Sequence, residues 1–211
     1  MPPTLQRYGT HGILFKWSEP VSRELLQQMI SFETQIQDRF STEVSSLVAG
    51  YNSVLVEFHR KVDVYWDEIS GLLSQQVSPI EFTSTIWQID VRYDLSHQDM
   101  THMSVQLGMN PEDIAEIHHS KDYDVFFIGF LPGFLYLSGL DERIHMPRKA
   151  TPDLHIPKGS VAIGRTQTGI YPTDSPGGWH IIGHTNHLFF DPYKSPPMQI
   201  KRGDRIRFKP T

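Results

Sequence analysis

The chain has 211 residues, which is enough for one large domain or two small ones and for a hydrophobic core without covalent staples. Its net charge is −5 and it contains no block of Lys and Arg, so nucleic acid and anionic membranes are poor candidates as partners. Cysteine is absent, which excludes disulfides, thiolate metal sites and a Cys nucleophile. Without an apolar span or signal-peptide pattern, the sequence predicts a cytoplasmic protein.

The first ninety residues show regular hydrophobic periodicity. Residues 12–17 predict a short strand, and alternating apolar residues over 54–58 predict another. Ser18 and Pro20 precede a helix whose apolar residues recur at helical spacing, namely Val21, Leu25, Met29, Phe32, Ile36 and Phe40. Asp63 is expected to cap a second helix, with apolar residues at Tyr65, Ile69, Leu72 and Leu73.

Residues 83–93 alternate strictly and predict a strand with one buried face. The alternating residues are Thr83, Thr85, Trp87, Ile89, Val91 and Tyr93. Together with the preceding elements, this strand predicts an α+β domain over residues 1–94, with two helices on one face of an antiparallel sheet.

The remainder predicts a second domain over residues 95–211. Two short helices are expected at 98–107 and 111–119, the second with Asn110 as N-cap and Pro111 at its first position. From Val125 onward the chain predicts short strands and tight turns, which implies a compact barrel. Ten of the 15 Gly and ten of the 15 Pro lie at or after Gly129.

Three ordered motifs in this second part indicate a pocket wall. They are GFLPGFLYL at 129–137, QTGIYP at 167–172 and SPGGW at 175–179. Gly permits close backbone approach and Pro fixes φ, so such runs form shaped loops joined by short strands. Polar groups that such loops hold in place are typical of small-ligand sites.

Several side chains in and near these motifs are candidates for the site. The amide of Gln167, the hydroxyl of Thr168 and the phenol of Tyr171 could line a pocket, or could satisfy one another in a tight turn. The successive amides of Gly177 and Gly178 could bind an anion, or could form a hairpin turn in which Trp179 anchors the core.

Other candidates come from charge and aromatic character. Phe134 could floor a pocket, and Arg148 could clamp a carboxylate or phosphate. His180 could act as acid or base. His180, His184 and His187 lack convergent further ligands, so we expect no metal site. GSVAIGRT at 159–166 lacks the strand-then-helix context of a P-loop.

In these motifs the chain resembles the KipI / PxpB family, also called allophanate hydrolase subunit 1-like. The resemblance implies an α/β N-terminal domain followed by a cyclophilin-like β-barrel. It also implies the PxpB component of an ATP-dependent 5-oxoprolinase that works with PxpC-like and PxpA-like partners, with Mg²⁺ accompanying the ATP. The residues that would serve this activity are the candidates already named, with Arg148, Gln167 and His180 as catalytic residues and Phe134, Thr168, Tyr171, Gly177 and Gly178 binding the substrate or nucleotide.

The family resemblance leaves two other functions open. KipI-type members resemble inhibitors of a sporulation histidine kinase, and related domains resemble one half of a carboxyltransferase in urea carboxylase-type enzymes. One fold hosts all three roles, so the fold alone does not choose among them. The chain also departs from the family pattern, with Gly164-Arg165-Thr166 where a small-Gly-Gly run is usual before Gln-Thr-Gly.

Overall fold

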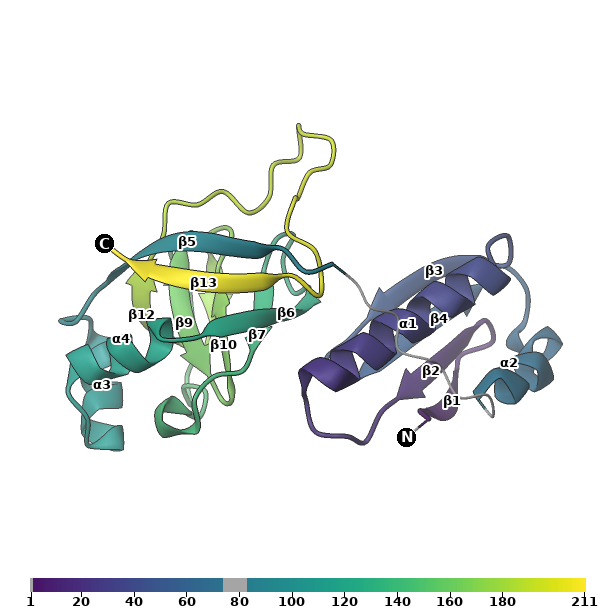
Figure 1. Cartoon of the computed structure of the whole chain (residues 1–211), viewed down its shortest axis with the longest axis horizontal. Helices are drawn as coiled ribbons and strands as arrows, with labels where there is room; N and C mark the ends of the chain where they lie inside the picture. Colours follow the sequence, from purple (N-terminus) through teal and green to yellow (C-terminus); the bar gives the residue numbers. More distant parts are fainter. Residues whose placement is uncertain (1, 74–82) are drawn as a thin grey trace. The chain divides into compact units, whose positions relative to one another are not determined.

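A computed structural model describes residues 2–73 and 83–211. The chain divides into two compact units, Met1–Phe82 and Thr83–Thr211 (Figure 1). In the first unit the elements are β1 (Thr4–Tyr8), β2 (Gly12–Lys16), α1 (Arg23–Arg39), β3 (Val44–Ala49), β4 (Ser53–Phe58), η1 (Val62–Val64) and α2 (Trp66–Leu73). The units are described separately below.

The first unit is a four-stranded antiparallel sheet covered by helix α1. Its strand order is β1-β2-β4-β3. The helix buries an apolar stripe that includes Leu25, Met29 and Phe32, and Phe32 packs on Phe15 of β2 with ring centroids 4.5 Å apart. This packing confirms the predicted amphipathic helix, because the residues at helical spacing are the ones that face the sheet.

The start of helix α1 differs from the prediction. Ser18 and Pro20 precede the helix, but its N-cap is Ser22, whose side chain accepts a hydrogen bond from Leu25 N–H at 3.1 Å. Strands β1 and β3 were not predicted from the sequence. Four of the five β1 residues are exposed, so that strand lacks the apolar alternation that indicates a half-buried strand.

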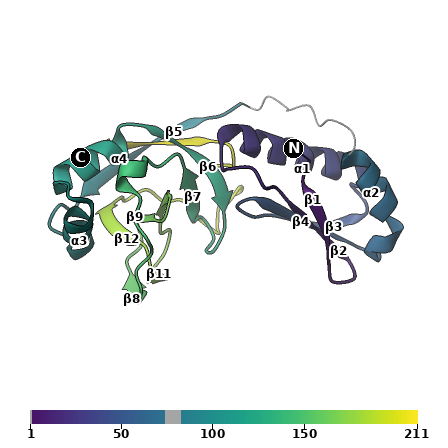
Figure 2. The same cartoon turned by 90° about the horizontal axis from the view of Figure 1, so that it is seen from below.

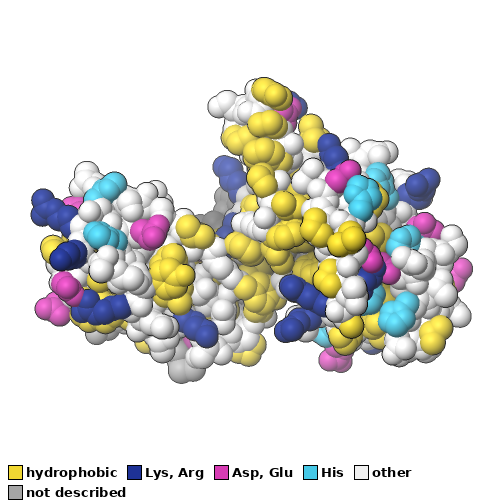
Figure 3. Space-filling model, turned by 180° about the vertical axis from the view of Figure 1, so that it is seen from behind, with side chains coloured by type: hydrophobic (Ala, Val, Ile, Leu, Met, Phe, Trp, Pro, Cys, Tyr) yellow, Lys and Arg dark blue, Asp and Glu magenta, His cyan; other side chains and the backbone are white. Residues whose placement is uncertain are grey.

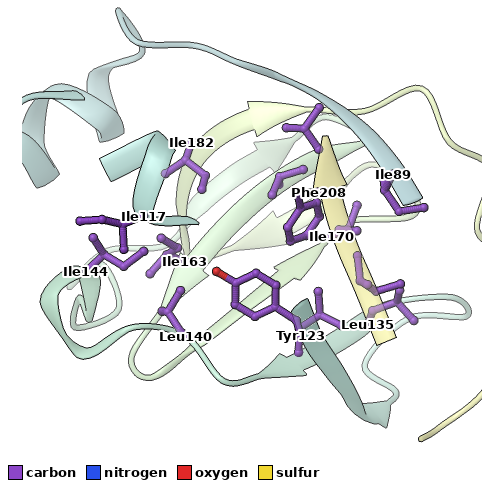
Figure 4. Close-up of a cluster of buried hydrophobic side chains, with 14 of the residues drawn as sticks. Ile89, Ile117, Tyr123, Leu135, Leu140, Ile144, Ile163, Ile170, Ile182 and Phe208 are labelled. Atoms are coloured by element: carbon purple, nitrogen blue, oxygen red, sulfur yellow. The ribbon is translucent and has the colours of Figure 1, made fainter. Parts of the chain in front are cut away.

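The second unit is a closed barrel with the strand order β10-β7-β6-β13-β5-β12-β9. Its strands are β5 (Ile86–Tyr93), β6 (Asp122–Ile128), β7 (Leu135–Ser138), β9 (Ser160–Gly164), β10 (Gln167–Ile170), β12 (His180–His184) and β13 (Arg205–Pro210). Figure 4 shows the apolar side chains from these strands filling the interior, among them Ile163, Ile170 and Phe208. The predicted fold class, α+β with a C-terminal barrel, is confirmed.

Strand β5 lies in the barrel and not in the N-terminal sheet where the sequence placed it. It runs parallel to β13, with Trp87 opposite Ile206, and antiparallel to β12, with Tyr93 opposite Gly183. The alternation itself is as predicted, since Ile89 and Val91 are fully buried, although the strand begins at Ile86 rather than Thr83. The two compact units accordingly divide before this strand, whereas the sequence suggested a division after residue 94.

Two helices and a separate two-stranded sheet accompany the barrel. Helices α3 (Gln98–Leu107) and α4 (Pro111–His119) lie where they were predicted, and α3 packs on β12. Strands β8 (Asp153–Ile156) and β11 (Ser175–Gly177) form a separate two-stranded sheet that extends away from the barrel (Figure 2). A short η2 turn (Glu142–Ile144) leads into the segment before β8.

A long segment without regular structure joins β12 to β13. It spans residues 185–204 and projects from the barrel unit in Figure 1. Tyr193 on this segment is 96% exposed, whereas Phe189 is buried in the barrel core. Of the helices in the described part of the chain, none is long and apolar enough to cross a membrane.

Candidate functional site

A cavity of about 690 Å³ lies between α3 and the segment that leads into β8. It is lined by Gln98, Asp99, His102, Gln106 and Leu107 of α3, by residues 145–151 and Asp153, and by His180 at the start of β12. Figure 3 shows one face of the barrel unit, on which histidine, Lys and Arg side chains lie beside exposed hydrophobic ones. Charged groups that converge on a hollow make this cavity the candidate site.

Lys149 is the centre of a partly buried charge network in this cavity. Its Nζ lies 2.6 Å from Asp99 Oδ2 and 2.5 Å from Asp153 Oδ2. Burial opposes the charged form of Lys149, but the hydrogen bonds to Asp153 and Asp99 outweigh it and raise its pKa. Asp99 also accepts a hydrogen bond from the Ile181 N–H at 2.8 Å, which ties α3 to β12.

His180 contributes a neutral imidazole to the same cavity. Its Nε2 lies 2.8 Å from the carbonyl oxygen of Pro147, and because a carbonyl only accepts, Nε2 carries the proton. Burial lowers the pKa of His180, and its ring stacks on His102 with centroids 5.5 Å apart. The buried Nδ1 has no hydrogen-bond partner among the described residues. The lone pair on Nδ1 is therefore available to accept a proton or a hydrogen bond.

Arg148 lies on the rim that separates this cavity from a second one of about 470 Å³. The second cavity is lined by residues 145–148 together with Arg165 and Thr166. The Arg148 guanidinium lies 5.8 Å from the centre of the Trp179 ring, a cation–π contact. No carboxylate within residues 2–73 and 83–211 forms an ion pair with Arg148, so its hydrogen-bond donors are available to a ligand.

Phe134 and Tyr171 lie in a buried aromatic cluster with Trp179. Phe134 packs edge-on against both Tyr171 and Trp179, with centroids 5.1 and 5.6 Å apart. Both residues are 2% exposed, and neither lines the two cavities. Burial raises the pKa of Tyr171 to about 12, so its phenol is neutral. The cluster thus holds Trp179 in place, and Trp179 makes the cation–π contact with Arg148.

Thr168 lies in the barrel interior, in a chain of polar groups. Its hydroxyl donates to the carbonyl of Ala162 at 3.1 Å and lies 2.8 Å from His118 Nε2. The other ring nitrogen of His118 lies 2.7 Å from the Tyr93 hydroxyl. Burial lowers the pKa of His118 to about 3, which keeps the ring neutral. The Thr168 hydroxyl is thus already used by the fold.

Of the remaining predicted residues, Gln167 lies on β10 and Gly177 on β11, and Gly178 directly follows β11. Gln167 is 8% exposed and its Nε2 has no partner among the described residues. Gly177 and Gly178 both lack a positive φ, so they do not form the alternating left- and right-handed turn of an anion-binding nest. A Cβ at Gly177 would lie 2.3 Å from the Tyr171 hydroxyl, so this glycine is required for packing.

Sequence reasoning missed Asp99 and His102, which form one wall of the larger cavity. They lie three residues apart and therefore share a helix face. That face of α3 also carries the buried Met103. A polar pair on an otherwise apolar helix face was therefore the signal in the sequence that could have indicated these two site residues. The histidines considered for a metal have separate partners, since His184 Nε2 bonds the Lys158 carbonyl while His180 bonds Pro147.

Comparison with known proteins identifies the family. The model described as "Carboxyltransferase domain, subdomain C and D" matches residues 3–200. The chain belongs to this family. Proteins named as the B subunit of 5-oxoprolinase are similar to it, with 44% identity in Bacillus subtilis (strain 168) over 97% of this chain and 91% of that protein. The Escherichia coli O157:H7 protein of the same name is 37% identical over 96% of this chain and 93% of its own length. The predicted resemblance to PxpB proteins is thus confirmed.

Several solved structures share this fold. TTHA0988 superposes with a TM-score of 0.82 at 27% identity, covering 96% of this chain but 40% of that one. The conserved uncharacterized protein PH0987 from Pyrococcus horikoshii gives a TM-score of 0.58 at 33% identity, covering 99% and 97% of the two chains. The urea amidolyase of K. lactis gives 0.76 at 18% identity over 100% of this chain and 15% of that one, a likeness that shows the fold alone.

Proposed function

We propose that this chain is the PxpB component of an ATP-dependent 5-oxoprolinase, in which 5-oxoproline, ATP and water give glutamate, ADP and phosphate. The observation that carries the proposal is similarity at 35–44% identity, over at least 89% of both chains, to three proteins named as the B subunit of 5-oxoprolinase. A subunit acts with others, so we further propose PxpC-like and PxpA-like partners and no activity of this chain alone. The lack of cysteine is consistent with assembly in the cytoplasm.

The chemistry of the lactam explains what such a component must supply. Amide resonance makes the ring carbonyl a poor target for water, and ATP supplies activation by making the amide oxygen a better leaving group. The substrate also carries a carboxylate that needs a cationic partner. Arg148, which lines both cavities and has no ion pair in the described chain, is suited to hold a carboxylate or phosphate.

His180 and Gln167 are proposed to act on the polar groups of the substrate. The neutral His180 ring offers the lone pair on Nδ1, and a lowered pKa keeps that lone pair free at neutral pH. The unpartnered Gln167 Nε2 offers a buried donor. Phe134 and Tyr171 support this constellation from the aromatic cluster, and Thr168, Gly177 and Gly178 shape the backbone near it.

The residues at the cavity fit ATP phosphates better than they fit Mg²⁺. Arg148 has its donors available, as phosphate oxygens require. Asp99 and Asp153 both pair with Lys149, so they are poorly placed to bind the hard cation. We propose that Mg²⁺ is held mainly by the nucleotide and by partner chains.

The proposal is tested by reconstitution. The purified chain is mixed with its PxpC-like and PxpA-like partners, and ADP and glutamate release from ATP and 5-oxoproline is compared with that of the partners alone. We expect release only when this chain is present. Arg148→Ala and Gln167→Ala should lower the rate, whereas Arg143→Ala, which removes an exposed Arg paired with Asp141, should not. Release that is independent of this chain would refute the proposal.

A further inference from the structure

The backbone of Arg165 adopts a conformation that is unfavourable for residues other than Gly. This residue is the first central residue of the two-residue turn between β9 and β10, with Gly164 opposite Gln167, and its φ is +57°. A positive φ at this position of a hairpin turn favours Gly. Among the described residues other than Gly, only Phe130 shares a positive φ. Strain of this kind persists where surrounding contacts impose it, and it is concentrated at functional sites.

Backbone hydrogen bonds hold this turn against the segment that carries Arg148. The Arg165 N–H donates to the Met146 carbonyl at 2.5 Å, and the Met146 N–H donates back to the Arg165 carbonyl at 3.1 Å. These two hydrogen bonds hold the turn against Met146, which lies two residues before Arg148. The fold thereby places Arg148 and Arg165, which come from two different segments, beside one cavity.

This cavity is the second one, of about 470 Å³, and both Arg148 and Arg165 line it. Neither guanidinium forms an ion pair within the part of the chain that the structure describes. Other arginines of the barrel unit do, since Arg143 pairs with Asp141, and Arg207 pairs with Asp122. Two like charges on one hollow repel each other unless an anion lies between them.

We propose that Arg165 is a specificity-determining residue which, with Arg148, binds an oxyanion in this cavity. The ligand class is a carboxylate or phosphate with at least two oxygens, because two guanidinium forks match that geometry. Thr166, which also lines the cavity, adds a hydroxyl to the same anion. In naming the 5-oxoproline carboxylate as one source, the inference rests on the proposed function. A terminal phosphate of ATP is the other source.

The test measures anion binding to the full chain by titration calorimetry. The probes are 5-oxoproline, inorganic phosphate and 2-pyrrolidinone, which is the same lactam without the carboxylate. Arg165→Gly should weaken binding of the preferred anion roughly tenfold or more, as expected for a lost hydrogen bond to a charged group. Its melting temperature should not fall, because Gly accepts the positive φ. Arg165→Lys should weaken binding less, and Arg143→Gln should bind as the wild type does.

The outcomes separate the ligand sources and the two proposals. Weakened 5-oxoproline binding, with no binding of 2-pyrrolidinone, assigns the substrate carboxylate, whereas weakened phosphate binding assigns a phosphate. Equal anion affinity in Arg165→Gly and wild type, or no anion bound by the wild type, overturns the inference. If Arg165→Gly loses anion binding while the reconstituted wild-type enzyme releases no glutamate, the anion site stands and the 5-oxoprolinase proposal fails.

Discussion

At the scale of single residues, Asp99 connects three parts of the barrel unit. It lies on α3, pairs with Lys149 and accepts the Ile181 N–H of β12. Asp99→Ala should therefore lower the free energy of unfolding by about 3 kcal/mol, because it leaves a largely buried cation short of one partner and a backbone donor unpaired. Chemical denaturation measures this loss.

The matched control for that variant is Asp153→Asn. The Asp153 side chain is 34% exposed, so its ion pair with Lys149 is screened by solvent and should contribute under about 1 kcal/mol. Asp99→Asn should fall between the two, since its amide oxygen can still accept from Ile181. An Asp99→Ala variant as stable as Asp153→Asn would show that the network does not support the fold.

His118 should make the stability of the barrel depend on pH. Burial lowers its folded-state pKa from 6.5 to about 3, so the unfolded chain binds a proton first as the pH falls. The stabilisation is fully present above pH 6.5 and decreases by up to about 1.4 kcal/mol per pH unit between pH 6.5 and 3. His118→Gln keeps a donor and an acceptor but does not titrate. Its unfolding free energy should fall less steeply between pH 6.5 and 4, and equal slopes would contradict this account.

At the scale of elements, strand β9 approaches Trp179 so closely that only Gly fits at position 164. A Cβ there would lie 2.6 Å from the indole ring. Gly164→Ala should lower the free energy of unfolding by roughly 1–3 kcal/mol through overpacking, and should displace Trp179 from Arg148. Thermal unfolding measures the first effect.

The control for Gly164 is Gly71 in helix α2, where a Cβ would meet none of the described residues within 4 Å. Gly71→Ala should stabilise the N-terminal unit by about 0.5–1 kcal/mol, since Ala is the better helix former. The same chemical change should thus have opposite signs at the two positions. A destabilising Gly71→Ala would mean that the surroundings of α2 are tighter than its contacts indicate.

Local pattern predicted elements well but not their partners. Helix α4 follows from Asn110 and Pro111 at its start, and the buried face of β5 follows from its alternation. The pairing of Trp87 with Ile206 does not, because alternation shows which face is buried and not which strand lies beside it. In the site, Arg148 lines both cavities and His180 lines the larger one, and their catalytic roles stay predictions. The sequence could not predict that Thr168 lies in the barrel interior, because that position depends on a contact with His118, which is far away in the sequence.

At the scale of the whole molecule, the place of β5 decides which fragment can fold. The barrel needs β5 between β13 and β12, and all seven of its strands lie after residue 82. Asp204 adds to this closure by accepting hydrogen bonds from the Thr85 N–H and from the Trp87 indole. A fragment that begins after residue 94 would leave β12 and β13 with unpaired edges.

We therefore expect residues 83–211 to unfold cooperatively when expressed alone, and residues 95–211 to aggregate or to lack a thermal transition. Circular dichroism during heating, with size-exclusion chromatography to assess aggregation, compares the two fragments. Restoring the missing strand as a synthetic peptide of residues 83–94 should recover folding of the shorter fragment, because it supplies the backbone partners that β13 and β12 have lost. If residues 95–211 fold as well as 83–211 without the peptide, β5 is dispensable and the barrel closes by another route.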